Sequence, residues 1–238
     1  MPVSTAPTHD SRYILRTTDF STLIRLLAPA WKCGPAWDRK LRLWGAACVR
    51  DHINILPERL RPQIDLAEQV GQAAFTPPLR ILHMANWRAN PVTHQDIWPP
   101  RGQESNVLHA LEFLFCRFQA TARLAEIPRY LARRPYVPGD RSVRVRKQCR
   151  EWFWCCVGVG EALPDHVRLD STVRALAEGI EADRAYDRLP ILADAIQEAG
   201  LDGHPILDHC RAGSAHCPGC NVLDAILRPE MACWYTGR

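Results

Sequence analysis

The sequence predicts an all-α fold, an irregular multi-helix bundle of about eight to ten helices with no significant sheet. Apolar residues recur three and four positions apart in most segments, which is typical of amphipathic helices. No stretch of alternating β-branched residues is present, and no Asn-Gly or Asp-Gly pair joins two alternating stretches. With 238 residues and 47% hydrophobic content, the chain is long enough to bury a full core without disulfides.

Several helices are expected in the first third of the chain. Asp19, or a threonine before it, is suited to cap a first helix whose apolar positions include Leu23 and Leu27. A second helix should begin near Asp38, with one apolar stripe that runs through Leu41, Trp44, Cys48, His52 and Ile55. A third should follow Pro57, with Pro62 in its first turn. Residues 76–102 contain five prolines and predict a long connection in which only residues 79–87 look helical.

The second half predicts further helices with clear boundaries. Long helices are expected over about residues 104–127 and 142–163, and Pro128 should end or kink the first. Asp170 and Asp187 are suited to cap the next two helices, and Gly200 fits the stop of the second. Two short helices should follow, over residues 205–213 and from Cys220 or Asn221 to a point before Pro229.

The domain organisation follows from these elements. We expect residues 1–15 to be disordered or extended and residues 16–235 to form a single helical domain, with a variable middle segment around 76–150. No apolar stretch approaches the roughly 18–20 residues that cross a bilayer, and the first residues lack the apolar segment of a secretory signal. We therefore expect a cytoplasmic protein with no membrane partner, whose ten cysteines are mostly reduced and buried. Adjacent Cys155 and Cys156 look like core packing.

A cluster of histidines and cysteines near the C-terminus is the strongest candidate for a metal site. The CPGC sequence has the Cys-x2-Cys spacing that can supply two corners of a zinc tetrahedron. Two further ligands are needed, and the predicted set is Cys210, His216, Cys217 and Cys220, with His209, Cys33 and Cys233 as alternatives. A structural zinc ion is the only cofactor that the sequence suggests. The simpler interpretation is that Cys210 and Cys220 pack in the core and that His216 caps a helix end or hydrogen-bonds to backbone, and a CxxC redox pair is a further alternative.

A basic segment between Arg129 and Arg150 suggests a second kind of site. The net charge of +4 is below that of a typical nucleic-acid-binding protein, but this segment concentrates positive charge. A solvated helix face is the simpler interpretation, and contact with phosphates is the alternative. The candidate nucleic-acid-binding residues are Arg133, Arg134, Arg141, Arg144, Arg146, Lys147 and Arg150.

No catalytic residues are predicted. The sequence has no P-loop, no HExxH motif and no GxGxxG after a strand, and carboxylate pairs such as Asp194 and Glu198 lie on expected exposed helix faces. Trp87 and Trp98 fall in irregular, proline-rich surroundings, where an aromatic side chain can anchor a protein partner. These two are the candidate partner-binding residues.

Two segments resemble a paralogue-rich family of uncharacterised bacterial proteins. The first is DRKLRLWGAACVR, residues 38–50, where the family has a DRKLRLF helix followed by alanines and cysteines. The second is residues 172–211, which contain RLPILADAIQEAG and HCR and are followed by His216, Gly219 and Cys220 of an H-x2-GC sequence. Cys217 and Asn221 depart from the family pattern, and residues 80–150 do not match it. The resemblance implies a helical fold in a bacterial protein and assigns no catalytic residue.

The function expected from these observations is that of a non-enzymatic helical accessory protein that binds another macromolecule, most simply a protein. A nucleic-acid-binding accessory protein that uses the segment from Arg129 to Arg150 is one alternative, and a zinc-stabilised structural module is another.

Overall fold

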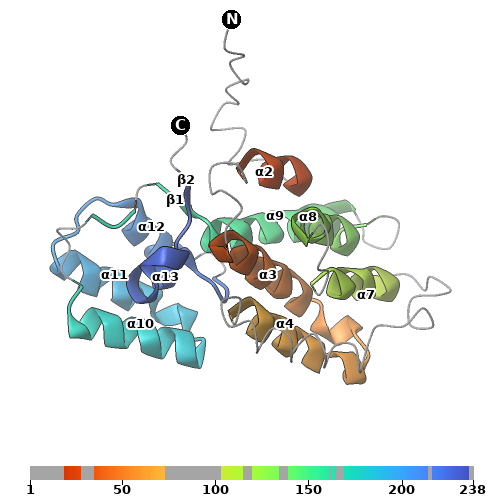
Figure 1. Ribbon diagram of the computed structural model, residues 1–238, viewed down its shortest axis with the longest axis horizontal. Helices are drawn as coiled ribbons and strands as arrows, with labels where there is room; N and C mark the ends of the chain where they lie inside the picture. Colours follow the sequence, from red (N-terminus) through yellow and green to blue (C-terminus); the bar gives the residue numbers. More distant parts are fainter. Residues whose placement is uncertain are drawn as a thin grey trace, which may run out of the picture.

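The structure is a computed structural model that describes residues 19–27, 35–72, 103–114, 120–133, 139–160, 162–164, 169–213 and 216–235. Within these ranges it contains ten α-helices, four short 3-10 helices and one pair of two-residue strands. The all-α prediction is therefore confirmed. In Figure 1 the helices form two neighbouring groups, one of α2 to α9 and one of α10 to α13, with α13 next to α3.

The first group is built around α3 (Pro35–Arg50), which contacts the other long helices of this group. Those neighbours are α4 (Pro62–Gln72), α7 (Gln103–Phe113), α8 (Ala120–Leu131) and α9 (Gly139–Cys156). Helix α2 (Phe20–Leu27) lies against α8, and η2 (Ile53–Ile55) and η3 (Glu58–Leu60) connect α3 to α4. Because nearly the whole of α3 is buried, its apolar stripe is packed on several sides at once.

Aromatic side chains form the core of the first group of helices. Trp44 on α3 is fully buried, and its ring lies 5.4 Å from that of Phe153 on α9, edge to face. Phe20 on α2 and Trp37 on α3 pack on the same Phe153 ring, at 6.2 and 6.3 Å. The indole nitrogen of Trp44 donates a hydrogen bond of 2.8 Å to the carbonyl oxygen of Cys149, so the polar atom of the side chain is satisfied in the core.

The second group consists of α10 (Ser171–Asp183), α11 (Leu189–Glu198), α12 (Pro205–Arg211) and α13 (Asn221–Leu227). Asp170 caps α10 by accepting a hydrogen bond of 2.8 Å from the Val173 amide, as the sequence predicted. Asp187, by contrast, lies within a 3-10 helix, η4 (Tyr186–Arg188), and α11 begins just after it. A last 3-10 helix, η5 (Pro229–Met231), follows α13.

A small parallel strand pair joins the two groups. Strand β1 (Gly158–Val159) follows α9 directly and pairs with β2 (Trp234–Tyr235) near the C-terminus. A Cβ atom at Gly158 would lie 2.3 Å from Asn221 Nδ2 and 2.4 Å from Trp234 Cε3, so only glycine fits this crossing. Two-residue strands leave no alternation to detect, which is why the sequence did not predict them.

Other boundaries also differ from expectation. The helix expected over residues 104–127 is two helices, α7 and α8, and Pro128 lies inside α8. The helix expected over 142–163 ends at Cys156, where the chain turns into β1. Residues 1–15 and the segment 76–102 lie outside the described residues, so the expectations for them stay predictions.

Candidate metal centre

Four side chains from three parts of the chain converge where the two groups of helices meet. Cys155 lies in the last turn of α9, His209 lies on α12, His216 follows α12, and Cys220 directly precedes α13. One ligand atom from each lies within 4.8 Å of the corresponding atoms of the other three. Both cysteines are buried and both histidines are half-buried. This set could hold a metal ion.

Two sulfur–nitrogen distances within the set agree with those of a tetrahedral zinc site. Cys155 Sγ lies 3.7 Å from His216 Nδ1, and Cys220 Sγ lies 3.6 Å from His209 Nε2. Zn–S bonds of about 2.3 Å and Zn–N bonds of about 2.0–2.1 Å place S and N about 3.6 Å apart in a tetrahedron. The two imidazole rings are nearly perpendicular, at 87°, with centroids 4.8 Å apart.

The turn before α13 presents Cys220 to the site. In this CPGC turn the Cys220 amide donates a hydrogen bond of 3.1 Å to the carbonyl oxygen of Cys217. Gly219 has a φ of 82° and packs so closely on α3 that a Cβ atom would lie 2.8 Å from Leu43 Cδ1. The positive φ and the lack of space both require glycine here. The spacing of CPGC therefore serves a tight turn against α3, and only its second cysteine belongs to the set of four.

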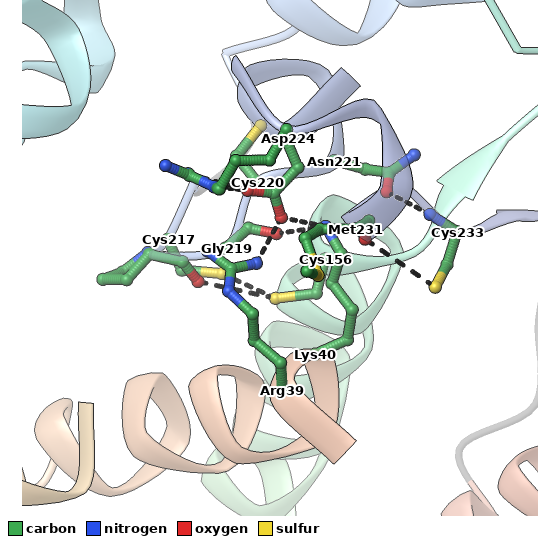
Figure 2. Close-up of polar contacts among 12 residues, drawn as sticks. Arg39, Lys40, Cys156, Cys217, Gly219, Cys220, Asn221, Asp224, Met231 and Cys233 are labelled. Atoms are coloured by element: carbon green, nitrogen blue, oxygen red, sulfur yellow. Dashed lines mark hydrogen bonds and ion pairs between the residues drawn. The ribbon is translucent and has the colours of Figure 1, made fainter. Parts of the chain in front are cut away.

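A buried cluster of charged side chains fixes this turn to α3. Arg39 Nη1 and Lys40 Nζ, on α3, each lie 2.5 Å from Asp224 Oδ2 on α13, and Lys40 also donates a hydrogen bond of 2.9 Å to the carbonyl oxygen of Gly219. Figure 2 shows both cations reaching from α3 to the turn and to α13. Asp224 and Lys40 are completely buried. Burial raises the pKa of Asp224, but Lys40 and Arg39 outweigh it and the net pKa is lowered.

The thiols and imidazoles of the centre shift one another's protonation. The hydrogen bond from Cys155 lowers the pKa of Cys220 well below its ordinary value, burial opposes this, and hydrogen bonds from His209 and His216 lower it further. Burial lowers the pKa of His209, but the hydrogen bond and negative charge of Cys220 outweigh burial, so the pKa is raised. The lowered pKa of Cys220 favours its thiolate, which is the form in which a cysteine binds a metal cation.

The structural set and the predicted set share His216 and Cys220. Cys210 and Cys217 are not among the four converging residues, and Cys155 and His209 take their places. His209 had a signal in the sequence, as an alternative ligand next to Cys210. Cys155 had none, because it lies 61 positions before His216 and looked like core packing.

The two remaining cysteines of the predicted set have other surroundings. Cys210 is buried on the inner side of α12, and burial, with the nearby Cys220, raises the pKa of its thiol. Cys217 lies with its sulfur 3.4 Å from that of Cys156, and the two are joined by a dashed line in Figure 2. All eight cysteines in the described part of the chain are free thiols.

Five of the candidate nucleic-acid-binding residues lie on α9, and Arg133 follows α8. Arg144 pairs with Asp140 at 3.2 Å, Lys147 with Glu151 at 3.7 Å, and Arg146 donates a hydrogen bond of 2.9 Å to Ser142 Oγ. Carboxylates on the same helix thus offset part of its positive charge. The full predicted set is Arg133, Arg141, Arg144, Arg146, Lys147 and Arg150, which the structure describes, and Arg134, which lies outside the described residues.

Trp87 and Trp98, the candidate partner-binding residues, both lie outside the described residues. Binding to a protein partner and binding to nucleic acid therefore stay predictions. Among the helices that the structure describes, none is long and apolar enough to cross a membrane.

No family model, no curated protein and no solved structure matches the chain. The resemblance to a bacterial family stays a prediction.

Proposed function

We propose that this chain is a zinc-stabilised helical module in which one zinc ion joins the C-terminal helices to the end of α9. The observation that carries the proposal is the convergence of Cys155, His209, His216 and Cys220. Two sulfur and two imidazole nitrogen ligands form a common structural zinc set. Two thiolates would also balance the two positive charges of Zn²⁺, so the occupied, buried site would carry no net charge.

A structural role agrees better with this set than a catalytic one. Catalytic zinc sites keep three protein ligands and leave the fourth position to water or substrate, whereas this set fills all four positions. Both sulfur ligands are also buried. The ion would bind α9 and the segment from α12 to α13 in the folded protein and not in the unfolded chain, so its binding free energy would add to the stability of the fold.

The position of the ligands explains what the ion would hold together. Cys155 belongs to the first group of helices, and the other three ligands belong to the second. The buried cluster of Arg39, Lys40 and Asp224 joins the same two groups. The ion would therefore reinforce a junction that already depends on buried charges, whose solvation would be costly if the groups separated.

The test is metal content measured on matched cysteine variants of the full chain. Wild-type protein purified with zinc in the growth medium should carry about one equivalent of zinc by mass spectrometry. Cys155→Ser and Cys220→Ser should each lose most of it. Cys210→Ser, the same change in a buried cysteine outside the set, should keep it.

The visible absorption of bound cobalt(II) tests the geometry of the site independently. Protein loaded with cobalt should show the intense visible absorption of a tetrahedral ion with thiolate ligands, absent in Cys155→Ser. Chelation should lower the melting temperature of wild type and leave that of Cys155→Ser unchanged. A wild-type zinc content below about a tenth of an equivalent would refute the proposal. So would a full equivalent in folded Cys155→Ser.

A further inference from the structure

A second pair of thiols lies directly beside the metal set. Cys156 Sγ and Cys217 Sγ are 3.4 Å apart, and both side chains are buried. A disulfide has an S–S length of about 2.05 Å, so the two sulfur atoms would need to approach by about 1.4 Å. Rotations about the two Cα–Cβ bonds can supply a movement of this size without a change in the fold.

Neither thiol would give up a strong interaction. Cys156 also contacts the carbonyl oxygen of Pro218 at 3.7 Å. Cys217 contacts the carbonyl oxygen of Trp152 at 3.8 Å and hydrogen-bonds with the Cys155 thiol. All of these are weak contacts of sulfur. Neither cysteine belongs to the set of four that could hold the ion, so a bond between them would leave all four ligands in place.

The pair joins the same two segments as the metal ligands do. Cys156 follows Cys155 at the end of α9, and Cys217 opens the CPGC turn that Cys220 closes. At the end of α9, Cys155 belongs to the metal set and Cys156 to the thiol pair. In the CPGC turn, Cys220 belongs to the metal set and Cys217 to the thiol pair. A link through either set would therefore hold α9 to the turn before α13.

A small oxidant has a route to one member of the pair. Cys217 lines a surface groove of about 330 Å³, together with Trp152, Tyr186, His216 and Pro218. Hydrogen peroxide is small enough to enter such a groove. Cys156, whose exposed fraction is 0%, lies behind Cys217 and is placed to react with it in a second step.

We propose that Cys156 and Cys217 are an oxidation site, in which a hydroperoxide converts the two thiols into a disulfide while the four metal ligands remain unmodified. The Cys217 thiol loses its proton, its sulfur attacks hydrogen peroxide and forms a sulfenic acid, and the expelled hydroxide takes up that proton and leaves as one water. The Cys156 sulfur then attacks the sulfenic sulfur, the S–S bond forms, and the hydroxyl group leaves with the Cys156 proton as a second water. Two electrons pass from the two sulfur atoms to the peroxide.

The protection of the ligands depends on the proposed function, because a bound zinc ion would occupy the lone pairs of Cys155 and Cys220. Without the ion, Cys155 and Cys220, whose sulfur atoms lie within 4.8 Å of each other, would be free to form a disulfide as well. The presence of zinc would thus decide which disulfides appear. The Cys156–Cys217 disulfide itself does not require the ion.

The experiment is disulfide mapping on the wild-type full chain. Zinc-loaded and chelator-treated protein would be exposed to hydrogen peroxide for long periods, because both thiols are buried. Remaining thiols would be alkylated, and digests would be read by mass spectrometry. Zinc-loaded protein should give the Cys156–Cys217 disulfide alone. Chelated protein should give both disulfides.

A stability measurement supplements the map. Protein that is oxidised while zinc is bound and then treated with chelator should melt on the order of 10 °C above reduced, chelated protein, because the Cys156–Cys217 disulfide closes a long loop in the unfolded chain. Cys217→Ser should abolish the shift. Cys233→Ser, the same change in a buried cysteine that contacts the Met231 carbonyl, should keep it.

The outcomes separate this inference from the proposed function. If the protein takes up no zinc but forms the Cys156–Cys217 disulfide, the metal proposal fails and the oxidation site stands. If zinc binds and peroxide leaves Cys156 and Cys217 as free thiols, the oxidation site is refuted. A Cys155–Cys220 disulfide as the main product of zinc-loaded protein would refute it also.

Discussion

Replacement of Asp224 by asparagine should destabilise this protein strongly, because the Asp224 carboxylate compensates two buried cations. Arg39 and Lys40 each lie 2.5 Å from Oδ2, and their exposed fractions are 2% and 0%. The other carboxylate oxygen, Oδ1, lies 2.8 Å from Arg228 Nη2. Asparagine has nearly the same shape but no charge, and it would turn an N–H group or an uncharged oxygen toward these cations.

The magnitude follows from the burial of the cluster. Arg228 also pairs with Glu181, so the cluster contains three cations and two carboxylates in the wild type and would keep only Glu181 after the change. Removal of one partner from a buried ion pair costs about 3–5 kcal/mol, because the remaining charge stays out of water. We therefore expect Asp224→Asn to lower the free energy of unfolding by about 3–5 kcal/mol at neutral pH.

Urea denaturation, followed by circular dichroism, measures this difference. Asp194→Asn is the matched control: Asp194 Oδ1 lies 2.6 Å from Arg211 Nη2, but 67% of its side chain is exposed. An exposed pair contributes about 0–1 kcal/mol, so the control should change little. A loss of less than about 1 kcal/mol in Asp224→Asn, or equal losses in the two variants, would refute the reasoning.

Two further predictions concern acid and glycine. The difference in unfolding free energy between wild type and Asp224→Asn should persist down to about pH 4 and close as the pH falls further. The reason is that the pKa of Asp224 in the folded protein lies below the ordinary 3.8, so the stabilisation is lost as the pH falls through that pKa. Denaturation of both proteins at several pH values measures the difference, and a difference that widens in acid would contradict this. Gly158→Ala should cost on the order of 2–3 kcal/mol in thermal melting, because its Cβ would lie 2.3 Å from Asn221 Nδ2. Gly179→Ala, with no atom within 4 Å in helix α10, should stabilise by about 0.5–1 kcal/mol, and equal effects at the two glycines would exclude a steric cause.

The candidate site was only half visible in the sequence. His216 and Cys220 lie close together in the chain, and their residue types suggested a metal. The CPGC spacing then favoured Cys217 as a partner, but the turn directs that sulfur toward Cys156. Local spacing shows which ligands are close along the chain, whereas the direction of each side chain depends on the turn and on what packs against it.

Some helix boundaries were likewise predicted from residue types, whereas others are set by tertiary contacts. Asp170 caps α10 and Gly200 has a φ of 100° after α11, as their residue types predicted. The end of α9 at Cys156 was not predicted, because what ends it is the pairing of β1 with β2, a segment near the other end of the chain. That pairing also brings the last turn of α9, and with it Cys155, next to the C-terminal helices.

The sequence by itself determined the all-α class, several helix caps and a C-terminal region rich in metal-binding side chains, because these depend on residue types and spacings within a few turns of the chain. The tertiary structure alone decided which four side chains meet, which thiols pair, and that Arg39 and Lys40 are buried against Asp224. Each of these contacts joins residues far apart in sequence. Packing of α3 and α9 against the C-terminal helices sets their distances, and no local pattern encodes it.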